Sequence, residues 1–173
     1  LGGTANQAVR ARWLRQPHVG PLDTSLGPGT PSGVGEDTEF FYRTLHAGGS
    51  IAYEPRAFVW HRHRDTIPAL ARQLRNYSSG HVAYHAALLT RFGDVRGLWH
   101  LGLDVNRHLV RRTRDRLLGR SSTPWSLVWA EARGFFVGPF NVVRTIAHAR
   151  RHGVARPLAP QDPWDARFDV SQV

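Results

Sequence analysis

The sequence predicts an α/β unit followed by an α-helical region, and two observations support this fold class. Between residues 36 and 60, a helical pattern with an acidic first turn is followed by a strand pattern. From Thr66 onward, apolar residues recur at helical spacing in long arginine-rich stretches, without a further strand pattern. We therefore expect an α/β unit at residues 1–65, a helical region at 66–152 and an extended tail at 153–173.

The composition is that of a folded, strongly basic protein. The 173 residues are 41% hydrophobic, which is enough to bury a core. The net charge of +10 comes from 23 arginines and no lysines, set against 13 acids. Guanidinium groups favour bidentate contacts with phosphate and carboxylate, although a GC-rich genome also produces this preference for arginine. The absence of cysteine excludes disulfides, thiolate metal sites and cysteine nucleophiles.

The sequence shows neither a signal-peptide pattern at its start nor a segment apolar enough to span a bilayer. The chain contains no methionine and begins without a charged segment or an apolar run of the signal-peptide type. No window reaches the ~18 consecutive apolar residues that span a bilayer. The most apolar stretch, Trp125 to Ile146, is interrupted by charged residues and predicts an amphipathic helix. We expect the chain to start inside a longer protein.

The first 60 residues are expected to form a helix, a loop, a second helix and a strand. After Gly2 and Gly3, the apolar residues up to Leu14 share one face of a short helix. Residues 17–35 are rich in proline and glycine and predict a long loop that can contact substrate. A helix then covers 36–47 and ends at a Gly-Gly pair, and Ile51 to Trp60 follows as a strand bent by Pro55.

The remainder is expected to be helical. The apolar spacing predicts helices over Ile67 to Phe92, Val95 to Leu118 and Pro124 to Arg151. The second of these has an apolar side and an arginine-rich end, and tryptophans occur in it and in the third helix. Such helices can lie on an anionic membrane surface, or they can pack on the preceding domain with a solvated arginine face.

Three groups of residues could carry chemistry. The first is the acidic turn of Glu36, Asp37 and Glu39, where a helix N-terminus stabilises negative charge. One interpretation is purely structural, because acids are common in a first helical turn. The other is that Asp37 is a general base that takes the proton of an attacking hydroxyl, and that Glu36 orients this acceptor.

The second group is the alternating run from His61 to Asp65. In extended backbone, His61, His63 and Asp65 share one side, and Arg62 and Arg64 share the other. Imidazole with carboxylate suits a divalent transition ion such as manganese, and the arginines suit a diphosphate. The alternative is an exposed edge strand, which charges and histidines protect from pairing.

The third group is Gly2 and Gly3, which precede a helix. They would let the backbone approach a sugar or phosphate closely, or they would form an ordinary turn.

Taken together, the motifs and their order resemble the C-terminal half of bacterial family 2 glycosyltransferases. The matching segments are G-G-T-A-N-Q-A-V-R, V-G-P-L-D-T-S-L-G-P-G-T, G-E-D-T-E-F-F-Y-R and Y-E-P-R-A-F-V-W-H-R-H-R. The resemblance covers Leu1 to about Asp65. It implies a GT-A (Rossmann-like) fold, a nucleotide-diphosphate sugar donor and a divalent metal, Mn or Mg.

The resemblance also implies roles for individual residues. Gly2 and Gly3 match the loop that faces the donor sugar, Asp37 matches the catalytic base of inverting members, and Glu36 matches the acceptor-side acid. His61 matches the histidine that ligates the metal. The family's D-x-D is absent from this chain and would precede Leu1. We therefore expect the isolated chain to be inactive and its longer parent to be active.

The expected partners follow from this resemblance. The acceptor would be a glycan or lipid-linked hydroxyl, and the protein would be cytoplasmic, with access to the inner face of the plasma membrane. The alternative is a non-enzymatic arginine-rich module that binds nucleic acid or a membrane surface. That alternative explains the charge but not the spacing of acids and histidines behind a glycine loop, so we do not expect nucleic acid as the partner.

Overall fold

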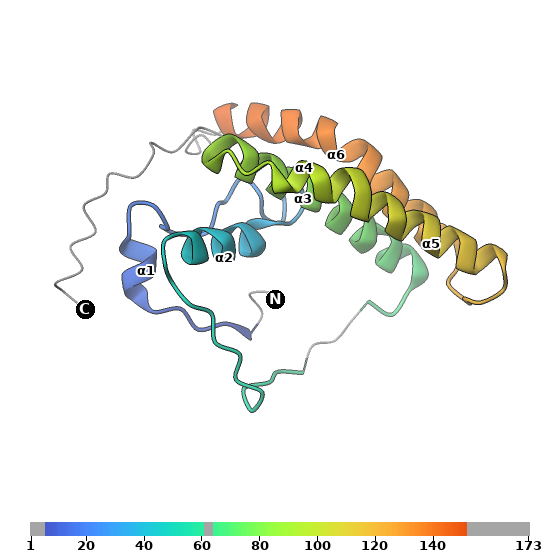
Figure 1. Cartoon of the computed structure of the whole chain (residues 1–173), viewed down its shortest axis with the longest axis horizontal. Helices are drawn as coiled ribbons and strands as arrows, with labels where there is room; N and C mark the ends of the chain where they lie inside the picture. Colours follow the sequence, from blue (N-terminus) through green and yellow to red (C-terminus); the bar gives the residue numbers. More distant parts are fainter. Residues whose placement is uncertain (1–5, 61–63, 152–173) are drawn as a thin grey trace.

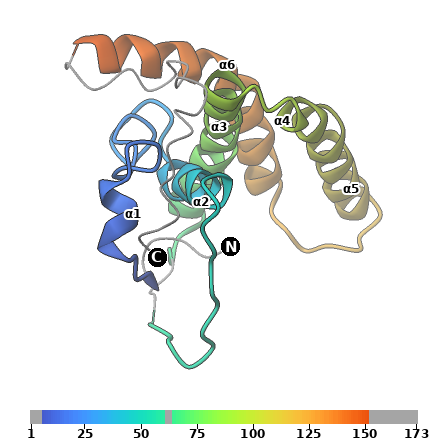
Figure 2. The same cartoon turned by 60° about the vertical axis from the view of Figure 1, so that its left-hand side comes forward.

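The computed structural model describes residues 6–60 and 64–151, and these residues form a helical protein without strands (Figure 1). The elements in chain order are α1 (Ala11–Arg15), α2 (Glu36–His46), α3 (Ile67–Phe92), α4 (Arg96–Trp99), the π-helical turn η2 (His100–Asp104), α5 (Val105–Leu117) and α6 (Trp125–Arg151). The four longer helices lie where the sequence patterns predict them. In both views, α1 and α5 lie at opposite ends of the molecule (Figures 1 and 2).

Helices α3 and α6 form the largest contact of the fold, and they run in the same direction. Their register shows this, because Gly134 packs on Arg75 and Ser78, whereas Gly138 packs on Val82 further along α3. A Cβ at Gly134 would lie 2.4 Å from the Arg75 carbonyl oxygen, so only glycine permits this approach. Small residues therefore let two long helices pack at close range.

Helices α4, η2 and α5 form one helical rod that returns from the end of α3 to the start of α6. Gly93 ends α3 in the left-handed conformation with φ of 64°, and Asp94 then begins the turn into the rod. The sequence predicts this rod as a single helix from Val95 to Leu118. The π-helical turn at His100–Asp104 interrupts its regular hydrogen bonding.

The proline- and glycine-rich segment 17–35 is a loop, as predicted, and it packs into the core. Leu26 is fully buried against Ala83 and Ala87 of α3. Ser32 shares a 2.8 Å hydrogen bond with Thr145 of α6. The loop therefore packs on both long helices, α3 and α6, and leads to the start of α2.

The predicted α/β fold is wrong for this chain, because Ile51 to Trp60 does not form a strand. Pro55 occupies a turn that the Ala57 N–H closes onto the Glu54 carbonyl at 3.0 Å. A strand also needs a neighbouring strand to satisfy its backbone groups, and none exists among residues 6–60 and 64–151. Tyr53 and Trp60 are consequently 89% and 95% exposed. The segment forms a long loop that projects away from the helices (Figure 1).

The N-terminal helix is shorter than the pattern predicts. Only Ala11–Arg15 is α-helical, because Arg10 has an extended backbone that prevents an earlier start. Val9 and Trp13 still pack on a small core of Val19, Phe40 and Phe41. No helix among the described residues is both long and apolar enough to cross a membrane.

Candidate functional site

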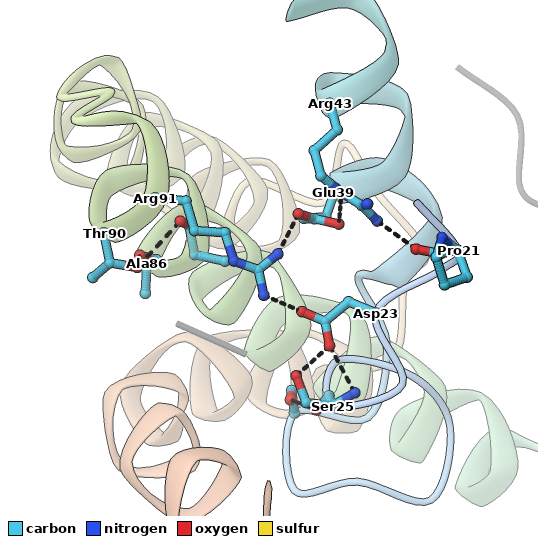
Figure 3. A network of polar contacts seen from close by, with 10 residues as sticks. Pro21, Asp23, Ser25, Glu39, Arg43, Ala86, Thr90 and Arg91 are labelled. Atoms are coloured by element: carbon cyan, nitrogen blue, oxygen red, sulfur yellow. Dashed lines mark hydrogen bonds and ion pairs between the residues drawn. The ribbon is translucent and has the colours of Figure 1, made fainter. Parts of the chain in front are cut away.

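A buried ion network joins helix α2 to the loop and to α3 (Figure 3). Glu39 is fully buried and accepts hydrogen bonds from Arg43 at 2.8 Å and from Arg91 of α3 at 2.5 Å. Arg91 also pairs with Asp23 of the loop. Burial of charges is costly unless each finds a partner, and here every member has one. The network thus joins α2, α3 and the loop.

The same network organises the loop backbone. The second carboxylate oxygen of Asp23 accepts from the Ser25 N–H at 2.8 Å and from the Ser25 hydroxyl. Arg43 donates to the Pro21 carbonyl at 2.9 Å. These contacts account for Glu39 of the predicted acidic triplet as a structural residue, which leaves Glu36 and Asp37 as the candidates for chemistry.

Glu36 and Asp37 lie in the first turn of α2, as the sequence predicts. The carboxylate of Glu36 accepts the Gly35 N–H at 3.0 Å, and burial raises the pKa of Glu36 above its ordinary value, with the nearby Asp37 charge acting in the same direction. Asp37 is partly exposed, and its Oδ1 accepts the Thr38 N–H at 2.8 Å. The hydrogen bonds from the Thr38 N–H and the Thr38 hydroxyl both go to Oδ1 of Asp37.

A cavity of about 520 Å³ lies between the loop and the first turns of α3. The loop contributes Pro28, Gly33 and Val34, and Arg64, Ala69, Arg72, Gln73, Asn76 and Tyr77 line the remainder. Gly33 and Val34 immediately precede the Gly35-Glu36-Asp37 turn. Arg64 and Arg72 give this cavity two guanidinium groups, which can bind an anion. Glu36 and Asp37 follow the cavity-lining loop in the sequence but are not among the lining residues.

The structure tests the position of only some predicted site residues. Gly2, Gly3, His61 and Arg62 lie outside the described residues. Arg64 is described and lines the cavity, but its expected role on an alternating strand is wrong, because the segment before it is not a strand. Arg72 was missed by sequence reasoning, since a single arginine in a helical pattern is indistinguishable from the surface arginines around it.

Sequence reasoning also missed a histidine cluster between α3 and η2. His81 and His85 come from α3 and His100 comes from η2, and one ligand atom from each lies within 4.8 Å of the other two. Neither ring nitrogen of His85 has a hydrogen-bond partner among the described residues, although both are buried. The spacing H-x-x-x-H, which places two imidazoles on one helix face, was the available signal.

The arginine-rich rod is less free to bind phosphates than its composition suggests. On α5, Arg111 and Arg114 both pair with Asp115, at 3.7 and 3.0 Å. Arg112 reaches Glu131 of α6 at 3.3 Å. Two of these arginines share a single carboxylate, so the pairs reduce the positive charge of α5 without cancelling it.

An aromatic face runs along α6. Trp129, Phe136 and Phe140 are 69%, 77% and 72% exposed, and Val143 continues the series. Their spacing of i, i+7, i+11 and i+14 places all four on one side of the helix. Arg133 and Arg144 lie on the same side and are exposed.

Comparisons of this chain with protein-family models, with curated proteins and with solved structures found no match.

Proposed function

We propose that this chain supplies the acceptor-side half of an inverting glycosyltransferase site, in which Asp37 is the general base. The proposal rests on the order of motifs from the glycine loop to H-R-H-R, and it does not require a sheet within the chain. The structural observation that supports it best is the loop that lines a two-arginine cavity and leads directly into the turn of Glu36 and Asp37.

In this mechanism the carboxylate of Asp37 takes the proton of the acceptor hydroxyl. The hydroxyl oxygen then forms a bond to the anomeric carbon of the donor, and the bond to the diphosphate breaks with inversion. Glu36, one residue earlier, orients the acceptor. The anchored α2 helix holds both carboxylates in place, so little reorganisation is needed when substrate binds.

The donor would be a nucleotide-diphosphate sugar, and its diphosphate would contact Arg64 and Arg72 in the cavity together with Arg62. Gly2 and Gly3 would approach the sugar. Mn²⁺ or Mg²⁺, when bound, would offset the negative charge of the leaving diphosphate. His61 is the proposed ligand, and an imidazole donor fits Mn²⁺ better than Mg²⁺. The D-x-D motif would come from a preceding segment of the same polypeptide.

Sugar transfer by the intact polypeptide tests this proposal. Release of nucleoside diphosphate is measured across a panel of donor sugars with glycan and lipid-linked acceptors. Asp37→Asn should lower kcat by roughly 10²–10⁴-fold, the usual contribution of a general base. Asp115→Asn, an acid of α5 outside the site, is the matched control. Activity near wild type in Asp37→Asn would refute the assignment.

A second candidate function is contact with an anionic membrane surface, which the aromatic face of α6 favours. Exposed aromatic residues with arginines alongside suit the boundary between headgroups and acyl chains. The net charge of +10 complements anionic lipid rather than a neutral bilayer. A lipid-linked acceptor would be reached from such a position.

Sedimentation with vesicles tests the membrane contact. Wild type should bind vesicles containing phosphatidylglycerol or phosphatidylserine, and should bind pure phosphatidylcholine much less. Trp129→Ser combined with Phe136→Ser should abolish binding, whereas Tyr53→Ser combined with Phe58→Ser, at exposed aromatics outside α6, should not. Loss of a dimer instead of lipid binding in the α6 variant would assign this face to self-association.

A further inference from the structure

We propose that His81, His85 and His100 form a binding site for one divalent ion of the zinc class, separate from the metal of the proposed sugar transfer. One ligand atom from each histidine lies within 4.8 Å of the other two. Three imidazoles with an open fourth position are a common ligand set for Zn²⁺, which binds histidine nitrogen at about 2.0–2.1 Å. On binding, the three rings would have to turn toward one another so that their nitrogens reach that distance.

The strongest support is the unused bonding capacity of His85. Both of its ring nitrogens are buried, and neither has a hydrogen-bond partner among the described residues. A buried polar atom without a partner is costly, and such atoms in folded proteins call for an explanation. Coordination of a metal through one nitrogen removes that cost for one of the two atoms.

The protonation states of the cluster suit a metal ligand. Burial lowers the pKa of His81 to about 4, and burial together with the neighbouring histidines lowers the pKa of His85 to about 4. Both rings are therefore neutral at neutral pH and carry a lone pair. Neutral imidazole is the form that binds metal.

His100 has a second partner of the kind that metal-binding histidines use. Its Nδ1 lies 3.1 Å from the Asp104 carboxylate, one helical turn later. A carboxylate that accepts a hydrogen bond from the Nδ1–H fixes the tautomer and leaves Nε2 free for the ion. His100 and Asp104 are the first and last residues of η2, and π-helical turns often occur at functional sites.

Gly97 shapes the site from the α4 side. A Cβ at this position would lie only 2.5 Å from Nδ1 of His85. The ring of His85 therefore packs directly on the α4 backbone at Nδ1, and its Nε2 is the nitrogen that can serve as ligand. Phe135 of α6 contacts the edge of His81 at 6.2 Å between ring centres and adds an apolar shell.

The site would join two elements that are otherwise connected through the turn at Gly93 and Asp94. His81 and His85 belong to α3, and His100 belongs to the rod that runs back beside it. An ion bound to all three would fix the position of the rod on α3. Binding to the folded state alone raises thermal stability, which gives a readout that is independent of sugar transfer.

Metal titration of the tag-free chain tests the site. Isothermal titration with Zn²⁺ and optical titration with Co²⁺ are performed on a His61→Ala, His63→Ala background, which removes the other histidine pair. We expect one equivalent to bind, visible Co²⁺ bands of imidazole ligation, and a higher melting temperature. His100→Ala, at a side chain that is 40% exposed, should weaken binding at least about tenfold without unfolding the chain.

Two further variants separate ligation from a general effect on the fold. Gly97→Ala keeps all three histidines but displaces His85, so it should weaken binding while circular dichroism stays unchanged. His108→Ala removes a histidine that pairs with Glu131 at 3.1 Å, and it should leave binding intact. Absence of stoichiometric binding in the background protein, or equal binding by His100→Ala and His108→Ala, would overturn the proposal.

Discussion

The two polar clusters that involve α3 differ in how completely their members are paired. In the ion network, Glu39 accepts from two arginines, and Arg91 donates to two carboxylates. In the histidine cluster, the rings contact one another, and both nitrogens of His85 are without a hydrogen-bond partner among the described residues. One cluster is complete in the protein alone, and the other has bonding capacity left.

This difference distinguishes polar groups whose partners all lie within the protein from polar groups that can still bind a ligand. A network whose donors and acceptors all match stabilises one arrangement of the chain, and it needs nothing from outside. A buried ring whose two nitrogens have no hydrogen-bond partner lowers the free energy of unfolding unless a ligand binds to it. The two clusters should therefore respond oppositely to removal of a central residue.

The largest effect is expected from Arg91→Met. This change leaves Asp23 and Glu39 without their shared partner, and breaking a buried ion network in this way costs about 3–5 kcal/mol in the free energy of unfolding. Urea unfolding followed by circular dichroism measures the loss. Arg56→Met, which breaks the exposed pair with Glu54, is the control and should have no measurable effect. Equal stability of the two variants would contradict the structural role of the network.

A second variant asks whether packing, as well as charge, holds the loop in place. A Cβ at Gly80 would lie 2.2 Å from the Val34 carbonyl oxygen, so Gly80→Ala should cost about 1–3 kcal/mol through overpacking. Gly102→Ala is the matched control, because nothing lies within 4 Å of its added Cβ. If thermal melting shows the two variants to be alike, the loop does not pack on α3 as described.

The helices were predictable from the sequence because their signals are local. Thr66 and Gly93, the residues that flank α3, are visible as cap residues in the sequence. After α2, the Gly49 N–H bonds to the Thr44 carbonyl at 2.8 Å, as the Gly-Gly pair predicts. Both kinds of signal act within one helical turn, so they predict the helix ends independently of tertiary contacts.

The strand prediction for residues 51–60 failed because a strand depends on a neighbouring strand, which its own residues do not specify. Residues 57–60 are apolar and β-prone, yet the turn at Pro55 and the absence of a neighbouring strand in the described parts leave them unpaired. The histidine cluster and the ion network share this property. His100 meets His85, and Arg91 meets Asp23, only after the helices pack, and neither contact has a local sequence signal.

The hydrogen-bonded carboxylate of Asp94 should make the free energy of unfolding depend on pH. Arg96 and Tyr42 both donate to its carboxylate, and chiefly the Arg96 hydrogen bond holds the pKa of Asp94 well below its ordinary value. The lowered pKa means that the ionised form stabilises the fold above the unfolded pKa of about 4, and that this contribution is lost as the pH falls below it.

Asp94→Asn should therefore lower the free energy of unfolding by about 1–2 kcal/mol near neutral pH. The difference from wild type should shrink as the pH falls below about 4. Urea unfolding at several pH values measures both. Glu54→Gln, at an exposed acid whose solvated pair with Arg56 contributes little to stability, serves as the control for a general charge effect. A difference that stays constant down to low pH would show that Asp94 acts through packing rather than through its charge.

The smallest effect in the absence of metal is expected from His85→Leu, and this variant tests the comparison most directly. Leucine fills a similar volume and removes two unpaired nitrogens, so the metal-free stability should stay within about 1 kcal/mol of wild type or rise. Addition of Zn²⁺ should then stabilise wild type but not the variant, because the ligand is gone. A large loss of stability without metal would mean that the nitrogens of His85 have partners in solution, and the contrast between the two clusters would fail.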